Sequence, residues 1–119
     1  MHDRFTALHP NRVKAVTAGS PGGWPILPVA DQNGTVFNYP IGIADLEALT
    51  GQSFDTEAFN QVPQLIYMGS ADDNDSLDFT DGWDPEMAQS VDELFGETPL
   101  KRWGDAEEIY ASAGAETEF

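Results

Sequence analysis

The chain contains 119 residues, of which 21 are acidic and 5 are lysine or arginine, and its formal net charge is −16. A field of this sign repels phosphate backbones and anionic lipid, so the composition argues against nucleic-acid binding and against attachment to a membrane surface. The chain has no cysteine, which excludes disulfides and thiolate zinc sites.

The remaining composition is that of a folded protein. A hydrophobic content of 40% and this length suit one domain with a modest core, spanning residues 1–119. No apolar stretch has the length of a signal peptide or of a transmembrane helix, so we expect a soluble, cytoplasmic protein. No lysine or arginine occurs between residues 15 and 100. So acidic a surface is typical of halophilic proteins, in which salt screens the self-repulsion.

The first twenty residues predict the end of a helix followed by a strand. Residues 4–8 form the helix, and His9 closes it because a residue that precedes proline is disfavoured in the helical conformation. The β-branched and small residues over 13–18 predict a short strand. A glycine-rich stretch over 19–23 cannot continue that strand and is expected to be an irregular loop.

The next segment, 24–62, is too long for a turn and is expected to carry structure of its own. Its sequence predicts a surface turn at 31–34 and a short amphipathic helix over 43–49. Asp55 is suited to cap a further helical turn that runs to about residue 60.

A second strand is predicted by the unbroken apolar run from Leu65 to Met68, which is typical of a parallel-sheet strand covered on both faces. Gly69 ends the strand. The loop that follows carries four polar side chains: Asp72, Asp73, Asn74 and Asp75. Parallel sheets place their binding and catalytic groups just beyond the carboxyl ends of the strands, so this loop is the candidate functional site.

Two helices are predicted after this loop. A capping aspartate, a proline at the first helical position and a terminal glycine indicate a helix over 84–95. A threonine and a proline likewise precede a helix over 100–112. The tail after Gly114 is expected to be frayed.

Four stretches of the chain occur in this order: RFTALHPNRVKAVTAGSPGG, VPQLIYMGSADDND, RW and EEIYASAG. Together they resemble the carboxyl-terminal half of an α/β-hydrolase of the esterase or depolymerase-like type. The resemblance implies that residues 7–13 form the turn into the family's sixth strand and that about 24–62 form a lid-like insertion. It also implies that residues 69–72 are the G-x-x-D loop that delivers the catalytic acid. The expected fold class is therefore α/β, a partial α/β-hydrolase-like fold with two parallel strands, flanking helices and a lid-like insertion.

The motifs include only one of the three groups of a hydrolase triad. The family's G-x-S-x-G elbow and its histidine, which follows an eighth strand, are both missing, so we expect a truncated member that is inactive by itself. Ser20 follows a strand, but Pro21 has no N–H that could be donated to an oxyanion. His2 and His9 are interpreted as a terminal residue and a helix-end residue, without visible support for a triad role.

Three interpretations of the acidic loop stay open at this stage. As the acid of a triad, Asp72 is the first choice by the G-x-x-D spacing and Asp75 is the second. As a calcium loop, the alternating oxygen ligands are suitable, but Leu77 and Trp83 occupy the positions where an EF-hand has glycine and glutamate. The third interpretation is ordinary surface charge. We expect no cofactor and no resident metal.

Two parallel strands alone leave apolar faces and edges open to water. We therefore expect either a homo-oligomer that joins strands into a continuous sheet or a complementary hydrolase half that carries the elbow and the histidine. The alternative function is a non-catalytic assembly module that completes its sheet by oligomerisation.

Overall fold

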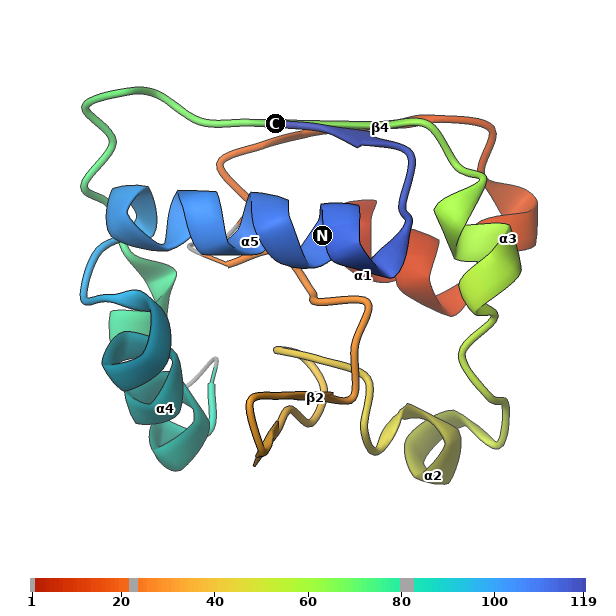
Figure 1. Cartoon of the computed structure of the whole chain (residues 1–119), viewed down its shortest axis with the longest axis horizontal. Helices are drawn as coiled ribbons and strands as arrows, with labels where there is room; N and C mark the ends of the chain where they lie inside the picture. Colours follow the sequence, from red (N-terminus) through yellow and green to blue (C-terminus); the bar gives the residue numbers. More distant parts are fainter. Residues whose placement is uncertain (1, 22–23, 80–82) are drawn as a thin grey trace.

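A parallel sheet of three strands, in the order β1–β4–β5, lies along one side of the molecule (Figure 1). The computed structural model describes residues 2–21, 24–79 and 83–119. In chain order the elements are α1 (His2–Leu8), η1 (Pro10–Arg12), β1 (Val16–Gly19), β2 (Asp31–Gln32), β3 (Thr35–Val36), α2 (Leu46–Thr50), α3 (Thr56–Asn60), β4 (Gln64–Tyr67), η2 (Ser76–Asp78), α4 (Pro85–Phe95), α5 (Pro99–Ala113) and β5 (Thr117–Glu118).

The sheet and its helices confirm the α/β class. β1 and β4 pair in parallel, with Val16 opposite Gln64 and Gly19 opposite Tyr67. The connection between them runs through β2, β3, α2 and α3, as a parallel pair requires. None of the helices in the described ranges is long and apolar enough to cross a membrane.

All of the described helices lie on one side of the sheet (Figure 1). Burial along β1 and β4 accordingly alternates, with Val16, Ala18 and Ile66 buried. On the other face, Leu65 is 40% exposed and Tyr67 54% exposed. The prediction that β4 is covered on both faces is therefore wrong. An unbroken apolar run is compatible with two covered faces, but the described residues place only one layer of helices against the sheet.

The tail forms the third strand, so the prediction of a frayed tail is also wrong. β5 pairs in parallel with β4, placing Thr117 opposite Gln64. The Phe119 ring lies edge-on to both Trp103 and Tyr110, each with a centroid separation of 5.3 Å. These ring contacts partly bury the Phe119 side chain and hold the tail in place, which the polar composition of the five-residue tail did not indicate.

The caps that were predicted from sequence are present. Asp84 accepts hydrogen bonds from the N–H groups of Glu86 and Met87 at the start of α4, and Gly96 ends that helix. Thr98 caps α5, and Gly114 ends it with a left-handed φ of 81°. Capping side chains satisfy orphan N–H groups that would otherwise need water, which explains why these boundaries were predictable.

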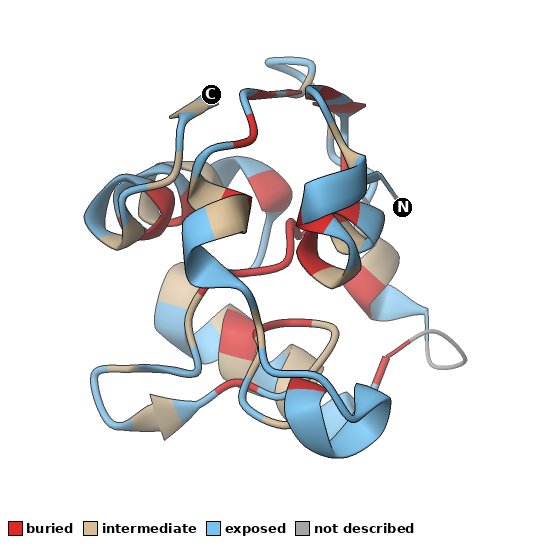
Figure 2. Ribbon diagram, turned by 90° about the vertical axis from the view of Figure 1, so that its right-hand side faces the viewer, coloured by how far each residue is buried: buried red, intermediate tan, exposed pale blue. Residues whose placement is uncertain are grey.

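The segment between β1 and β4 contributes much of the buried core rather than only covering it. Trp24, Ile26 and Leu27 are almost fully buried, and the Tyr110 hydroxyl of α5 donates to the Ile26 carbonyl at 2.5 Å. Of the predicted turn at 31–34, residues 31 and 32 form β2, and residues 33 and 34 join it to β3 as a hairpin. In Figure 2 the buried positions lie in the interior between the helices and the exposed ones on their outer sides. Of the predicted loop over 19–23, residues 22 and 23 lie outside the described ranges.

Candidate functional site

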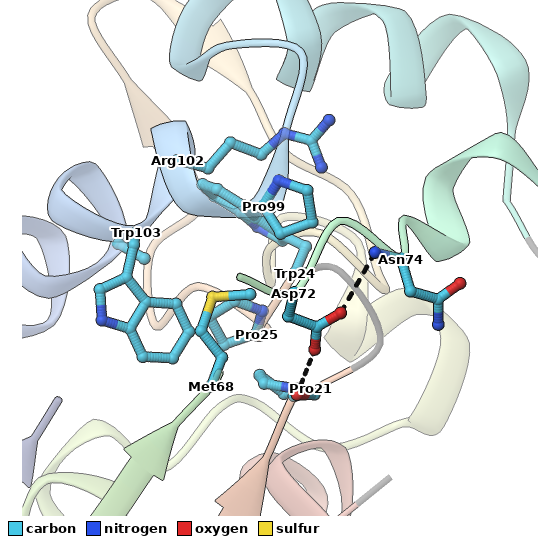
Figure 3. A pocket seen from close by; sticks show the side chains of 11 residues that line it. Pro21, Trp24, Pro25, Met68, Asp72, Asn74, Pro99, Arg102 and Trp103 are labelled. Atoms are coloured by element: carbon cyan, nitrogen blue, oxygen red, sulfur yellow. Dashed lines mark hydrogen bonds between the residues drawn. The ribbon is translucent and has the colours of Figure 1, made fainter. Parts of the chain in front are cut away.

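The carboxyl ends of β1 and β4 bring Ser20 and Asp72 into contact. Because Gly19 lies opposite Tyr67 in the parallel register, the two loops that follow leave the sheet at the same edge. The Ser20 hydroxyl donates to Asp72 Oδ2 at 2.7 Å, and the N–H of Asn74 donates to Asp72 Oδ1 at 3.1 Å (Figure 3). Asp72, the first-choice acid, thus lies just beyond the carboxyl ends of the strands, as predicted.

The local backbone explains how Ser20 reaches Asp72. Ser20 has a φ of 42°, a conformation that residues other than glycine, asparagine and aspartate seldom adopt. A Cβ at Gly19 would lie 2.7 Å from the Tyr67 ring, so a larger residue there would require the half-exposed Tyr67 side chain to move. The chain therefore turns sharply at the end of β1, and this turn carries the serine hydroxyl to the carboxylate.

These hydrogen bonds lower the pKa of Asp72 below its ordinary value. The Ser20 hydroxyl is the larger cause and the Asn74 N–H the smaller, while slight desolvation opposes both. Hydrogen bonds donated to a carboxylate favour its charged form. Asp72 is consequently a permanent anion at neutral pH, suited to orient and stabilise a cation rather than to accept a proton itself.

Replacing Ser20 with alanine is expected to raise the pKa of Asp72 toward its ordinary value of 3.8, because the larger of its two hydrogen bonds is lost. A carboxyl group whose pKa is lower in the folded state stabilises the fold at any pH above its unfolded-state pKa. This stabilisation is lost as the pH falls through the folded-state pKa. In the variant this contribution should be smaller, and its loss should be complete at a higher pH, because the folded-state pKa of Asp72 lies closer to the unfolded-state pKa. Side-chain carboxyl NMR over pH 2–6 measures the change, with the neighbouring Asp73 as the internal reference. An unchanged Asp72 titration in the variant would contradict the assignment.

The second-choice acid, Asp75, has a different environment. Its Oδ1 accepts the N–H of Leu77 at 3.0 Å, and its Oδ2 forms an ion pair with Arg102 Nη2 at 2.8 Å. Both side chains are buried, with Asp75 8% exposed and Arg102 1% exposed. The geometry therefore uses Asp75 to hold the acidic loop against α5.

Arg102 joins three segments. Besides Asp75, its guanidinium contacts the Asp92 carboxylate of α4, and its Nε donates to the Gly96 carbonyl at 2.6 Å. In the sequence Arg102 belongs to the RW pair of the family resemblance, but no role was predicted for it. The available signal was that Arg102 is the only arginine after residue 12 of a strongly acidic chain. Arginine is seldom fully buried unless it is ion-paired, and Asp75 and Asp92 supply that pairing here.

The structure does not bring a histidine to Asp72. His9 lines a hollow between η1 and the segment from α2 to α3, and His2 lines another beside β1. Among the described residues, Asp72 has hydrogen bonds only from Ser20 and Asn74. Ser20 itself donates to a carboxylate of lowered pKa, and Pro21 follows it, so neither a base nor an oxyanion donor supports it as a nucleophile.

The calcium interpretation gains no support from the arrangement of the loop. The carboxylates of Asp72 and Asp75 face different partners, Ser20 and Arg102 respectively. Within the described ranges, no three or more histidine, cysteine, aspartate or glutamate side chains are grouped as metal ligands would be. Calcium needs six to eight oxygen ligands, which these divergent side chains do not supply.

A narrow crevice lies beside the Ser20–Asp72 pair (Figure 3). Its walls include Trp24 from the loop after β1, Met68 from the end of β4, and Arg102 and Trp103 from α5. The crevice combines the candidate acid with apolar and N–H-bearing side chains from three parts of the chain. Comparisons with protein-family models, with curated proteins and with solved structures find no match for this chain.

Proposed function

We propose that the chain supplies the acid-bearing corner of an ester hydrolase of the α/β-hydrolase type, with Asp72 as the triad carboxylate. The supporting observation is the position of Asp72, which follows the central strand of a parallel sheet and is held as an anion by Ser20 and Asn74. Such strand ends are where open α/β sheets place their functional groups.

In this function Asp72 acts through a histidine. A carboxylate that accepts an imidazole Nδ1–H fixes the tautomer in which Nε2 takes the proton of a nucleophile, and it stabilises the imidazolium that results. The nucleophile then attacks the ester carbonyl, the alcohol leaves with that proton, and water releases the acid from the acyl-enzyme. Each Asp72 oxygen has one protein donor, which leaves lone pairs for the imidazole.

The nucleophile and the histidine are proposed to lie outside these 119 residues, on further sequence or on a complementary chain. The open face and edge of the sheet support this, since strands in a complete core are covered on both sides. The test is to express the 119 residues alone and together with the coding sequence that flanks them. In molar potassium chloride, only the longer product should hydrolyse phenyl acetate.

Turnover by the 119 residues alone would contradict the proposed division of the triad. Absence of turnover from both products, when both are folded by circular dichroism, would contradict the hydrolase assignment. Reading the flanking sequence gives an independent check, because a G-x-S-x-G elbow upstream and a histidine downstream are both required.

The second candidate function is a non-catalytic assembly module, and it is favoured by the free edge of β1. The N–H groups of Val16 and Ser20 bond to the carbonyls of Pro63 and Tyr67 in the neighbouring chain segment. Alternate backbone groups, including those of Thr17, consequently face away from β4, and the described part of the chain places no strand there. An unpaired edge of this kind accepts a strand from another molecule.

Replacing Thr17 with proline is expected to reduce assembly, because proline removes one outward N–H while remaining compatible with an edge strand. Light scattering in molar potassium chloride should give at least twice the 13.0 kDa chain mass for the parent protein. The variant should shift toward the monomer. Thr17→Val, which keeps the N–H, is the matched control and should assemble like the parent. A clean monomer for the parent chain would exclude self-assembly through this edge.

A further inference from the structure

The outer edge of β1 has three outward-facing backbone positions. Val16 and Ser20 donate their N–H groups to carbonyls on the β4 side. Backbone groups alternate in direction along a strand, so those of Ala15, Thr17 and Gly19 face away from β4. All three residues are exposed, and the described part of the chain places no strand beside them. This edge is therefore available for pairing with another molecule.

Both ends of this free edge are closed. The N–H of Val13 donates to the carbonyl of the first residue of η1 at 3.1 Å, and Pro21 has no N–H. The outward N–H groups thus form a set of three that is centred on Thr17. Such a set is complementary to a second copy of itself. When two β1 strands run antiparallel about a two-fold axis at Thr17, Ala15 of each lies opposite Gly19 of the other, and all three donors are paired.

The charges at the two ends of β1 favour this antiparallel arrangement. Lys14 is exposed at the amino end and forms no ion pair within the described ranges. At the carboxyl end, the Ser20 hydroxyl contacts the anionic Asp72, and Asp73 is exposed beside it. Antiparallel pairing places Lys14 of each copy opposite Ser20 of the other, next to these carboxylates. Parallel pairing would instead bring two acidic loops together, which is unfavourable.

Apolar surface beside the edge adds to the pairing. A hollow between α1 and the start of β1 has walls that include Phe5, Val13 and Val16, and the Phe5 side chain is 49% exposed. A two-fold axis between antiparallel strands of one sheet is perpendicular to that sheet, so the helices of both copies lie on the same side. The two hollows then face each other, and each Phe5 can be buried against the partner.

We propose that the occupant of this edge is a second copy of the chain, in a closed two-fold dimer whose β1 strands pair antiparallel about Thr17. Three strands from each copy then form one continuous sheet, with Lys14 of each copy beside the other's Ser20–Asp72 pair. The dimer is closed because the same edge serves in both copies. The inference deepens the proposed assembly function and rests on it for the use of the β1 edge, while it is independent of turnover at Asp72.

The main test is cysteine cross-linking of the 119-residue chain in molar potassium chloride with oxidised glutathione. The chain has no cysteine, so one introduced thiol reports on a single contact. Thr17→Cys, on the two-fold axis, should form a disulfide between the copies and give twice the 13.0 kDa chain mass by mass spectrometry. Ala15→Cys, the matched control on the same edge, should not, because four residues of extended chain separate its two copies by about 14 Å.

The second test concerns the charge at position 14. Lys14→Glu is expected to weaken the dimer about tenfold, because two attractive contacts with the acidic loops become repulsive. Lys14→Arg keeps the charge and should dimerise like the parent. Light scattering over a range of chain concentrations measures all three proteins.

The possible failures are distinguishable. A parent chain that stays monomeric overturns the proposal together with the assembly function. A dimer in which Thr17→Cys does not cross-link, or Ala15→Cys does so equally, overturns the two-fold pairing and leaves assembly intact. Growth beyond two copies contradicts the closed dimer. Equal dimerisation by Lys14→Glu and Lys14→Arg contradicts the antiparallel arrangement, and this comparison decides even if Thr17→Cys does not fold.

Discussion

Asp72→Asn is expected to lower the rate of ester hydrolysis by about 10⁴-fold in the longer product that contains the nucleophile and the histidine. The amide keeps the size of the side chain and one carbonyl oxygen, so Ser20 or Asn74 can still donate to it. The charge that stabilises an imidazolium is lost, and the amide N–H₂ favours the wrong histidine tautomer. The kcat for phenyl acetate hydrolysis is the quantity to measure.

Asp73→Asn is the matched control for this prediction. Asp73 is the adjacent residue, is exposed, and undergoes the same change of charge. Its substitution should leave kcat within about twofold, since exposed charges contribute little at high salt. Equal losses from the two variants would mean that general loop charge, and not a triad acid, supports activity. An Asp72→Asn variant with full activity would remove Asp72 from the mechanism.

Arg102→Met is expected to lower the free energy of unfolding by about 3 kcal/mol, at the lower end of the range for breaking a buried ion pair. Methionine retains an apolar stem, but the buried carboxylate of Asp75 then loses its counter-charge, and the Gly96 carbonyl loses a donor. Asp92 is more exposed, at 39%, and water can solvate it, which places the effect near the lower limit. Urea unfolding at fixed potassium chloride concentration measures the loss.

Lys101→Met provides the control for the same change of charge and shape one residue earlier. Lys101 is exposed and its contact with Glu97 is a surface pair at 3.9 Å, so its loss should change stability by less than about 0.5 kcal/mol. Adding Asp75→Asn to Arg102→Met should recover part of the stability, because the unpaired charge is removed. Equal unfolding midpoints for the two methionine variants would show that the buried ion pair does not hold the acidic loop.

Local sequence signals determined much of the framework. Asp84 and Thr98 mark helix starts through hydrogen bonds to neighbours two or three residues away. Both partners of such a bond lie in one short stretch of sequence, so the cap can be predicted from that stretch. The parallel pairing of β1 and β4 was predictable because the long segment between them permits a crossover connection. The same reasoning placed Asp72 at a strand end and therefore in the candidate site.

Tertiary structure alone decided which of these groups meet and which surfaces stay open. The pairing of Ser20 with Asp72 spans 52 positions, and that of Arg102 with Asp75 depends on where α5 packs, so neither follows from local pattern. The apolar run at 65–68 is compatible with a strand that is covered on one face or on both. How many layers of helices pack against the sheet decides between the two. The sequence thus specified the helix ends, whose capping interactions are short-range, while β5, the ion pair, the crevice and the exposed sheet face depend on contacts between distant segments.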